Sequence, residues 1–309
     1  MVRSIADYNQ VHSRAIGEGG ARSKQYINFE NLNKIATKSE LLLLTDNANA
    51  SVRCYAFLAL AKRKDSSVLT ILTKHLHDTT TVKTFQGCII SRYRVGDYFL
   101  DVVTSKYQEP DAYKLSLSEN NLIDSILIFD ATIMLSAKWS AIQRAPASEK
   151  HYERIRSIYI QTSSGKCIVY LSKFHKERDK DLIVKLLVDT SIWQWFDGLK
   201  AVRHFPANDF FPYLQTIQKR ELAEVSTNTG HILGMLYRAM VQYKDSASRQ
   251  MIEKVLKDSK TEINHEHAIY IVAALERFPD PIYDGLKELA VMSEYDRITV
   301  DHWKHDSFD

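Results

Sequence analysis

The chain has few of the residues that interrupt helices. Its 309 residues include only ten glycines and six prolines, and no Ser/Gly-rich or low-complexity stretch divides it. Flexible linkers between domains usually consist of such stretches, so the sequence shows no domain boundary. Only residues 105–118 are irregular enough to form a joint, and one continuous helical array is the simplest interpretation.

Long hydrophobic runs are also missing. No run of about eighteen apolar residues occurs, which excludes a membrane-spanning helix. The polar first 24 residues do not form a signal peptide. The sequence as given therefore predicts a cytoplasmic protein, and an exported one if a native leader has been removed.

Cysteine is scarce, and the three residues are widely spaced. Cys54, Cys88 and Cys167 include no close pair of the kind that binds structural zinc or forms a redox dithiol. We therefore expect three free thiols. Cys54 and Cys88 fall in apolar segments that we interpret as helices, where a small side chain allows close packing.

Motifs for catalysis and for ligand binding are absent. The sequence has no Gly-x-Ser-x-Gly elbow, and Gly17–Gly20 lacks the flanking residues of a phosphate loop. His75 and His77, like His265 and His267, point about 200° apart if they lie on a helix, which is unsuitable for a shared metal ion. The sequence predicts no enzyme, no metal and no cofactor.

A large excess of one charge is missing too. Lys and Arg number 41 against 38 Asp and Glu, a formal net charge of +3. A groove that binds duplex nucleic acid concentrates cations. A protein or peptide is therefore favoured as the partner over nucleic acid.

What the sequence does contain is a pattern of helical hairpins. In Glu40–Arg63, an apolar segment is followed by a polar turn with Asp46 and Asn49, and then by a second apolar segment that ends in basic residues. Short polar side chains cap helices and favour turns, and cations suit a helix C-terminus. The stretch predicts two helices, with Leu41–Leu44 covered by neighbours on nearly every side.

A related pattern follows directly. An apolar segment from Val68 ends at Asp78, and the next segment opens with Val82 and Lys83. Asp78 lies 32 residues after Asp46, and a period in the thirties with two helices per unit is typical of an α-solenoid. We therefore predict that the segment from Val82 is a helix.

These residues resemble the HEAT repeat family, in which the turn of each hairpin commonly carries an Asp and the second helix opens with Val-Arg or Val-Lys. The matching positions are Asp46 with Val52-Arg53, and Asp78 with Val82-Lys83. The resemblance implies an all-α fold, a right-handed α-α superhelix of stacked hairpins. It would cover residues 28–292, between a polar lead-in at 1–27 and a tail at 293–309.

The C-terminal half shows the pattern more loosely. Helices are expected to end at Phe205-Pro206 and at Phe278-Pro279, 73 residues apart, which fits two repeats. An aromatic residue in the tail gains by packing on the last repeat, so we expect Trp303 to dock there.

The middle of the chain is ambiguous. The apolar run Ile126–Phe129 is compatible with a helix or a strand. We favour a helix, capped within Ser118–Asn121, and expect another over Ile133–Ile142.

Candidate contact residues come from the expected second helices. On Ile192–Phe205, the apolar face leaves Trp193 to one side with Lys200 near it, and an aromatic beside a cation suits a contact patch. The alternatives are that Trp193 fills the seam between repeats and that Arg and Tyr stems cover apolar helix surface. The candidates for a shared concave lining are Trp193, Lys200, Arg203, Tyr237, Arg238, Arg92, Tyr93 and Arg94.

The resemblance implies a non-catalytic scaffold or adaptor that binds a protein or peptide in a concave helical surface. One alternative is similar in architecture: a HEAT-like DNA-binding protein or glycosylase for alkylated bases, with Trp193, Arg203 and Asp197 in conceivable roles but no site transferred. Another is an inhibitor or immunity-type protein that occludes its partner. A strongly positive groove would favour DNA, and a mixed or apolar groove would favour a protein.

Overall fold

The computed structural model describes residues 1–106, 109–189, 191–223, 229–258 and 262–305. The chain divides into two compact units, Met1–Ala145 and Pro146–Asp309, which we call unit 1 and unit 2. Within the described residues, no helix has both the length and the hydropathy that crossing a bilayer requires.

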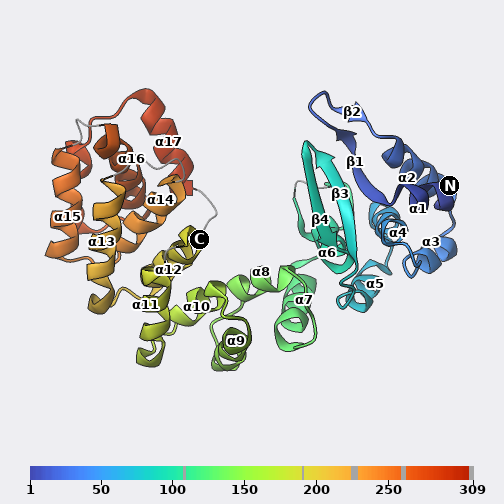
Figure 1. The fold of residues 1–309 in the computed structure, drawn as a ribbon, viewed down its shortest axis with the longest axis horizontal. Helices are drawn as coiled ribbons and strands as arrows, with labels where there is room; N and C mark the ends of the chain where they lie inside the picture. Colours follow the sequence, from blue (N-terminus) through green and yellow to red (C-terminus); the bar gives the residue numbers. More distant parts are fainter. Residues whose placement is uncertain (107–108, 190, 224–228, 259–261, 306–309) are drawn as a thin grey trace. The chain divides into compact units, whose positions relative to one another are not determined.

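Unit 1 combines helices with a small sheet (Figure 1). In chain order its elements are α1 (Val2–Tyr8), β1 (Gln10–Ile16), β2 (Ala21–Arg22), α2 (Lys24–Ile35), α3 (Lys38–Leu44), α4 (Ala50–Lys62), α5 (Val68–Lys74), β3 (Thr81–Gly87), β4 (Ile89–Arg94), α6 (Val95–Thr104), α7 (Leu117–Phe129) and α8 (Ala137–Arg144).

The sheet overturns the prediction of an all-α superhelix. Its strand order is β2-β1-β3-β4, with β1 and β3 parallel and the other two pairs antiparallel. The protein therefore has a mixed α and β fold, mostly helical, in place of a pure α-solenoid. Residues 1–27, expected as a lead-in, supply α1, β1, β2 and the start of α2.

The segment from Val82 is a strand because its side chains alternate with a period of two. Val82 and Thr84 are buried, whereas Lys83 between them is exposed, and β-branched residues favour an extended backbone. The parallel partner of Lys83 is Gln10, 73 positions earlier in the chain. The helix expected here was wrong: the resemblance to a repeat was followed in place of this alternation, and the pairing partner is too distant in the chain to be recognised locally.

The helical hairpin predicted over Glu40–Arg63 is confirmed as α3 and α4. Thr37 and Glu40 form a capping box at the start of α3, and the Asn49 side chain caps α4. Almost every residue of α4 is buried. Leu43 on α3 is 76% exposed, so the cover expected on every side of that helix is not present.

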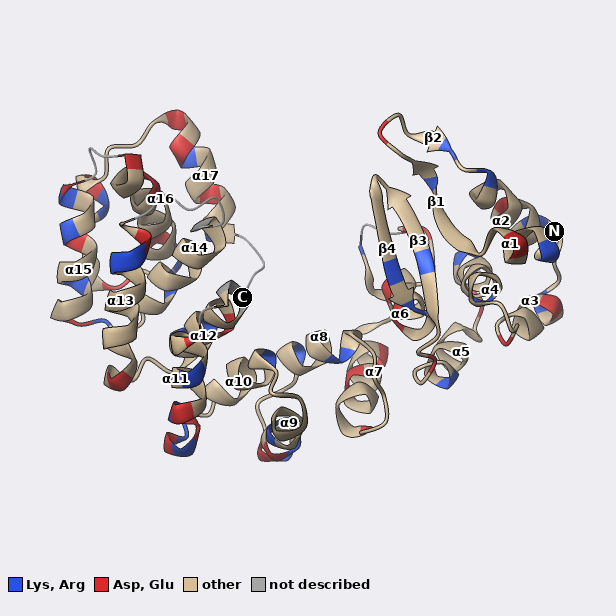
Figure 2. Ribbon diagram, in the orientation of Figure 1, with Lys and Arg blue, Asp and Glu red and all other residues tan. Residues whose placement is uncertain are grey.

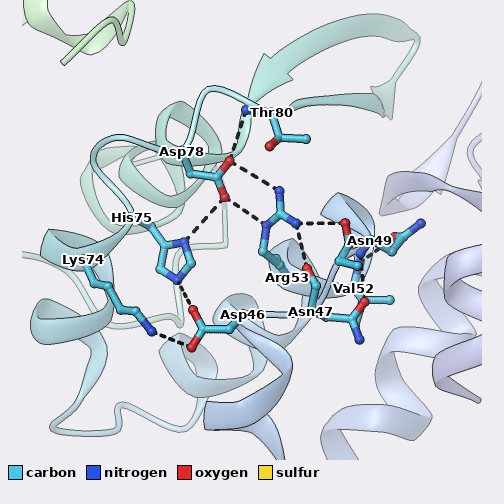
Figure 3. A network of polar contacts seen from close by, with 10 residues as sticks. Asp46, Asn47, Asn49, Val52, Arg53, Lys74, His75, Asp78 and Thr80 are labelled. Atoms are coloured by element: carbon cyan, nitrogen blue, oxygen red, sulfur yellow. Dashed lines mark hydrogen bonds and ion pairs between the residues drawn. The ribbon is translucent and has the colours of Figure 1, made fainter. Parts of the chain in front are cut away.

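A network of polar contacts holds this hairpin against the start of β3 (Figure 3). Arg53 pairs with Asp78 at 2.9 Å, and the Asp78 carboxylate accepts a hydrogen bond from the Thr80 N–H. His75 lies between Asp46 and Asp78, 3.3 and 3.5 Å from their carboxylate oxygens. The residues that resemble the HEAT pattern thus anchor a strand in this protein.

The same network fixes both ends of the β3–β4 hairpin. The Thr80 carbonyl accepts from the Val95 N–H, and the Asp78 carbonyl accepts from the Gly96 N–H, each at 3.0 Å. Burial alone would raise the pKa of Asp78, but the hydrogen bonds from Thr80 and the charge of Arg53 outweigh it and lower that pKa. Asp78 is therefore a charged, well-bonded anchor at neutral pH.

The middle of the chain is helical, as expected for Ile126–Phe129, which lies in α7. The cap is Ser116, in a capping box with Glu119, and not a residue of Ser118–Asn121. α8 begins at Ala137, so the helix expected from Ile133 is shorter than predicted.

Unit 2 is built from helices throughout its described residues. Its α-helices are α9 (Glu149–Thr162), α10 (Gly165–Ser172), α11 (Lys180–Val188), α12 (Ile192–His204), α13 (Phe211–Glu221), α14 (Thr229–Met240), α15 (Ser246–Lys257), α16 (Glu262–Arg277) and α17 (Glu294–His305). The helix ends predicted at Phe205 and Phe278 are confirmed.

The C-terminal segment docks on unit 2 through Trp303, as predicted. Its ring centroid lies 5.1 Å from that of Tyr270 and 5.3 Å from that of His231. A Cβ placed on Gly234 would lie 3.3 Å from the indole, so the absence of a side chain there allows close packing.

Candidate functional site

The β3–β4 hairpin has a regular register that sorts its side chains onto two faces. Val82 lies opposite Tyr93, Lys83 opposite Arg92, and Thr81 opposite Arg94. Gly87, in the turn, has a φ of 55°, which glycine adopts without strain. Directly paired residues point to the same side of a sheet, so each face can be read from these pairs.

One face of the hairpin is closed. Val82 is 2% exposed and Thr84 is fully buried, and both β1 and β3 contact α4. The Tyr55 hydroxyl of α4 also lies 2.8 Å from the backbone nitrogen of His12 in β1. The hairpin is therefore held on a rigid support.

The other face is exposed and positively charged, and we call it the basic face. Its members are Thr81, Lys83, Phe85, Ile90, Arg92 and Arg94. Lys83 and Arg92 are exposed, Arg94 and Phe85 are partly buried, and Ile90 is 58% exposed. Figure 2 shows basic positions on both strands of the hairpin.

The cations of the basic face are not neutralised within the fold. In the part of the chain that the structure describes, the side chains of Lys83, Arg92 and Arg94 form no ion pair or hydrogen bond. Lys83 and Arg92 are directly opposite, and like charges in that position destabilise a sheet. An anionic ligand would remove this repulsion, and charged side chains on an edge strand also protect it from pairing with another chain.

A neighbouring histidine responds to this charge. His12 in β1 lies opposite Phe85 in the parallel pairing, with the two rings 5.6 Å apart. Burial, and then the positive charge of Lys83, lowers the pKa of His12. The imidazole is therefore neutral at pH 7 and adds no charge to the face.

A pocket of about 640 Å³ adjoins the C-terminal end of β4. Its walls come from β4, α6, α7 and α8, with Leu100, Ile123 and Leu127 as apolar lining. Arg92, Tyr93 and Arg94 contribute the wall from β4. The basic face and the pocket thus share two arginines.

The acids of this pocket are occupied by other groups. Asp97 accepts hydrogen bonds from the N–H groups of Ser136 and Ala137 at the start of α8. Asp124 holds Arg144 in a two-pronged pair with distances of 2.7 and 2.9 Å. Asp97 and Asp124 therefore make their hydrogen bonds to α8 and not to the arginines of β4.

Asp101 is the third acid of the pocket, and burial raises its pKa. Its Oδ2 atom has no hydrogen-bond partner among the described residues. A carboxyl group with a raised pKa carries its negative charge less readily. The positive charge of Lys114 opposes this shift.

Arg92 and Tyr93 were expected at the end of a second helix, and the structure corrects this placement. Both lie on strand β4 with Arg94. Because the side chains of a strand alternate, Arg92 and Arg94 share the basic face while Tyr93 points to the other side. Lys83, the opposite cation, was not among the candidates, although the alternation of Val82, Lys83 and Thr84 could have identified it.

The cations predicted on α12 are involved in contacts within unit 2. Lys200 is only 5% exposed, and its ammonium group lies 4.7 Å from the ring centroid of Phe196. Arg203 is partly buried, with Nη2 at 3.0 Å from Nε2 of His204. The side chain of Trp193 lies outside the described part of the structure, and so does the predicted pair with Lys200.

Tyr237 and Arg238 are core residues, in contrast to the surface position expected for them. Tyr237 is fully buried, and its hydroxyl lies 2.6 Å from Nδ1 of His267. Arg238 is 2% exposed and donates a hydrogen bond to the carbonyl of Trp303. The structure therefore does not join these residues to Arg92 and Tyr93 in one lining.

The remaining chemical candidates are dispersed. Among the described residues, no group of three or more His, Cys, Asp or Glu side chains is placed to hold a metal ion. The three cysteines are free thiols. Cys54 is buried as expected, but Cys88 is exposed in the β3–β4 turn and not packed in a helix.

The charge difference between the units agrees with these local observations. Unit 1 contains 18 Lys and Arg against 14 Asp and Glu, a formal net charge of +4, whereas unit 2 contains 23 against 24, a net charge of −1. The small net charge of the whole chain is therefore the sum of a basic unit 1 and a nearly neutral unit 2.

Comparison with family models, with curated proteins and with solved structures gives no match to this chain. No residue role is therefore transferred from a relative, and the candidate site rests on the geometry of the basic face.

Proposed function

We propose that the protein is a non-catalytic binding module that holds an acidic segment of a protein partner on the basic face. The observation that carries this proposal is that Lys83 and Arg92, two exposed cations, lie directly opposite each other. Neither side chain forms an ion pair with a described residue. Like charges directly opposite on a sheet lower stability. Binding of an anionic ligand would explain why these two cations are retained in spite of their repulsion.

The chemistry of the neighbouring residues supports a protein segment. Ile90 is 58% exposed and Phe85 is partly buried beside the cations, so the face offers apolar contact together with charge. Interfaces between proteins combine an apolar centre with charged groups that select the partner. We also propose a cytoplasmic location, which the three free thiols support.

A DNA-binding function, including base removal by a glycosylase, has weaker support. The basic face provides three cations, and Asp and Glu nearly balance Lys and Arg over the whole chain. Proteins that bind duplex DNA make many phosphate contacts, commonly about 6 to 10. An inhibitor that occludes its partner would use the same face, and binding alone does not separate it from an adaptor.

The test is a binding titration with a fluorescent acidic peptide and, separately, with a single-stranded oligonucleotide. We expect the wild-type chain to bind the peptide and Arg92→Glu to weaken that binding at least about tenfold, because each close charge contact contributes on the order of 1.4 kcal/mol. The matched control is Lys34→Glu, the same charge change on the exposed side of α2 in unit 1.

Equal weakening by both variants would mean that net charge, and not the basic face, governs binding. Preference for the oligonucleotide, with a steep dependence on salt, would overturn the proposal in favour of nucleic acid. Circular dichroism of each variant checks that the fold is intact.

A further inference from the structure

β4 is an edge strand of the sheet, and its pairing with β3 identifies the backbone groups on its open side. The order β2-β1-β3-β4 leaves one side of β4 without a partner strand among the described residues. The Val95 N–H donates to the Thr80 carbonyl, so Thr80 and Val95 form a hydrogen-bonded pair. In an antiparallel ladder such pairs alternate with non-bonded ones.

The alternation assigns Val82 with Tyr93, and Thr84 with Ser91, to the bonded pairs. Lys83 with Arg92, and Phe85 with Ile90, are then the non-bonded pairs. The backbone N–H and C=O groups of Ile90 and Arg92 consequently point away from β3. In β4, the residues whose side chains lie on the basic face are therefore also the residues whose backbone groups lie on the open edge.

We propose that the acidic segment binds as a fifth, antiparallel strand on the open edge of β4. This inference rests on the proposed function and specifies how the partner is recognised. Backbone hydrogen bonds to Ile90 and Arg92 supply affinity, and alternate side chains of the added strand supply specificity. The antiparallel direction continues the pairing already made by β3 and β4.

The geometry specifies the sequence pattern of the partner. In an added antiparallel strand, the residues opposite Arg94, Arg92 and Ile90 follow one another at every second position from the N-terminal side. Their side chains lie on the basic face, about 4.5–5.5 Å from those of β4 between Cβ atoms. The expected segment therefore reads acid-x-acid-x-apolar, with the apolar residue against Ile90.

A strand explains the spacing of the cations better than a helix does. Arg92 and Arg94 are two residues apart on a strand, which separates them by about 6.6–6.8 Å. Acids two positions apart in an extended segment have the same separation and point to the same side. On a helix, residues two positions apart point in different directions.

The exposed aliphatic side chains of β4 provide a second reason for a covered edge. Ile89 is 67% exposed and Ile90 is 58% exposed, next to each other at the start of the strand. An edge strand with exposed apolar residues is a template for pairing with another chain. The charge of Arg92 and Arg94 then selects a chain that carries acids.

The first experiment compares two labelled peptides of identical composition. One carries two Glu residues two positions apart followed by Val at the same spacing, and the other carries the two Glu residues side by side. Adjacent residues of a strand point to opposite faces. We therefore expect the alternating peptide to bind wild-type protein at least about tenfold more tightly than the adjacent one.

The second experiment tests the backbone contacts without altering the protein. In antiparallel pairing, the N–H groups of the two acids and of the apolar residue point toward β4, whereas those of the x positions point away. N-methylation of the two acids and of the apolar residue should abolish binding. N-methylation of the x positions should leave the affinity of the peptide within about threefold of its original value. Loss only with the x set would overturn the antiparallel direction, and equal tolerance of both would overturn strand addition.

A protein variant provides an independent measurement. Ile90→Pro removes an N–H from the open edge without removing a bond to β3, a position where a strand tolerates proline. The matched control Ile90→Ser removes the same apolar side chain and keeps the N–H. We expect Ile90→Pro to bind the alternating peptide at least about fivefold more weakly than Ile90→Ser, and equal binding would contradict the inference.

Failure of this inference and failure of the proposed function give different results. If both peptides bind equally and Arg92→Glu weakens both, the basic face binds acids but not as an added strand. If neither peptide binds and Arg92→Glu instead causes self-association on size-exclusion chromatography, both proposals fail. The cations then serve to protect the edge from pairing with another copy of the chain.

Discussion

Two pairs of cations, one pair in each unit, lie in opposite surroundings. In unit 1, Lys83 and Arg92 stand exposed on a sheet whose other face is closed. In unit 2, Lys200 and Arg238 are 5% and 2% exposed, within a helical core. A sheet that is covered on one side presents every second residue to water, whereas a helix packed among helices is enclosed all round.

The electrostatic consequences differ accordingly. In unit 2 the positive charge acts within the unit: burial, and then the charges of Arg203 and Lys173, lower the pKa of His204 to about 3. The cations of the basic face form no ion pair with a described residue, and Lys83 and Arg92 are exposed to solvent. A cation therefore indicates a binding surface only when its side chain is exposed.

The largest expected effect is the loss of stability on truncation of Arg238 in unit 2, for which Arg92 in unit 1 is the comparison. Arg238→Ala removes a buried side chain and leaves the Trp303 carbonyl without this donor, and should lower the free energy of unfolding by about 2–4 kcal/mol. Arg92→Ala should change it by less than about 0.5 kcal/mol, because the side chain is exposed and unpaired. Urea unfolding followed by circular dichroism measures both, and equal losses would remove the distinction between the units.

A second prediction concerns the pH dependence of unit 2. Burial lowers the pKa of His267 to about 4, below the value of about 6.5 in an unfolded chain. The unfolded state then binds a proton more readily, so stability is complete above about pH 6.5 and is lost as the pH falls toward 4. The expected loss is about 2–3 kcal/mol.

The check is unfolding at several pH values for wild type and for His267→Gln, which should have a flatter profile between pH 6.5 and 4. His305→Gln, at an exposed position on α17, is the control and should keep the wild-type slope. An unchanged slope in His267→Gln would assign the pH dependence to other groups.

The smallest expected effect is a gain in stability. Lys83→Glu places a carboxylate directly opposite Arg92, and an opposite-charge pair across a sheet contributes about 0.2–1 kcal/mol of stability. We expect a small rise in the thermal midpoint together with weaker binding of acidic peptides. Lys83→Gln should fall between wild type and Lys83→Glu in both measurements, and a fall in stability with Lys83→Glu would show that the charges are compensated in the native fold.

Several elements could be predicted because the information lies close together in the sequence. Thr37, Glu40 and Asn49 cap the two helices of the α3–α4 hairpin within three residues of each helix start. The ends of α12 and α16 lie just before Phe-Pro pairs. Local backbone chemistry is sufficient for such features.

The β3 strand could not be predicted in the same way. Val82 and Lys83 resembled the start of a second repeat helix, and only the alternation of the next residues favoured a strand. The strand is stabilised by β1, whose Gln10 pairs with Lys83 across 73 positions of the chain. The basic face was missed for the same reason, since it exists only when β3 and β4 lie side by side.

Neighbouring residues were enough to predict that the protein is mostly helical, where several helices begin and end, and that Trp303 packs on the C-terminal helices. The contacts between distant segments were needed to show that four segments form a sheet, that Arg238 and Lys200 are buried, and that Lys83 and Arg92 lie opposite each other on an exposed face. Caps and helix ends depend on neighbouring residues, whereas burial and strand pairing depend on which distant segments meet.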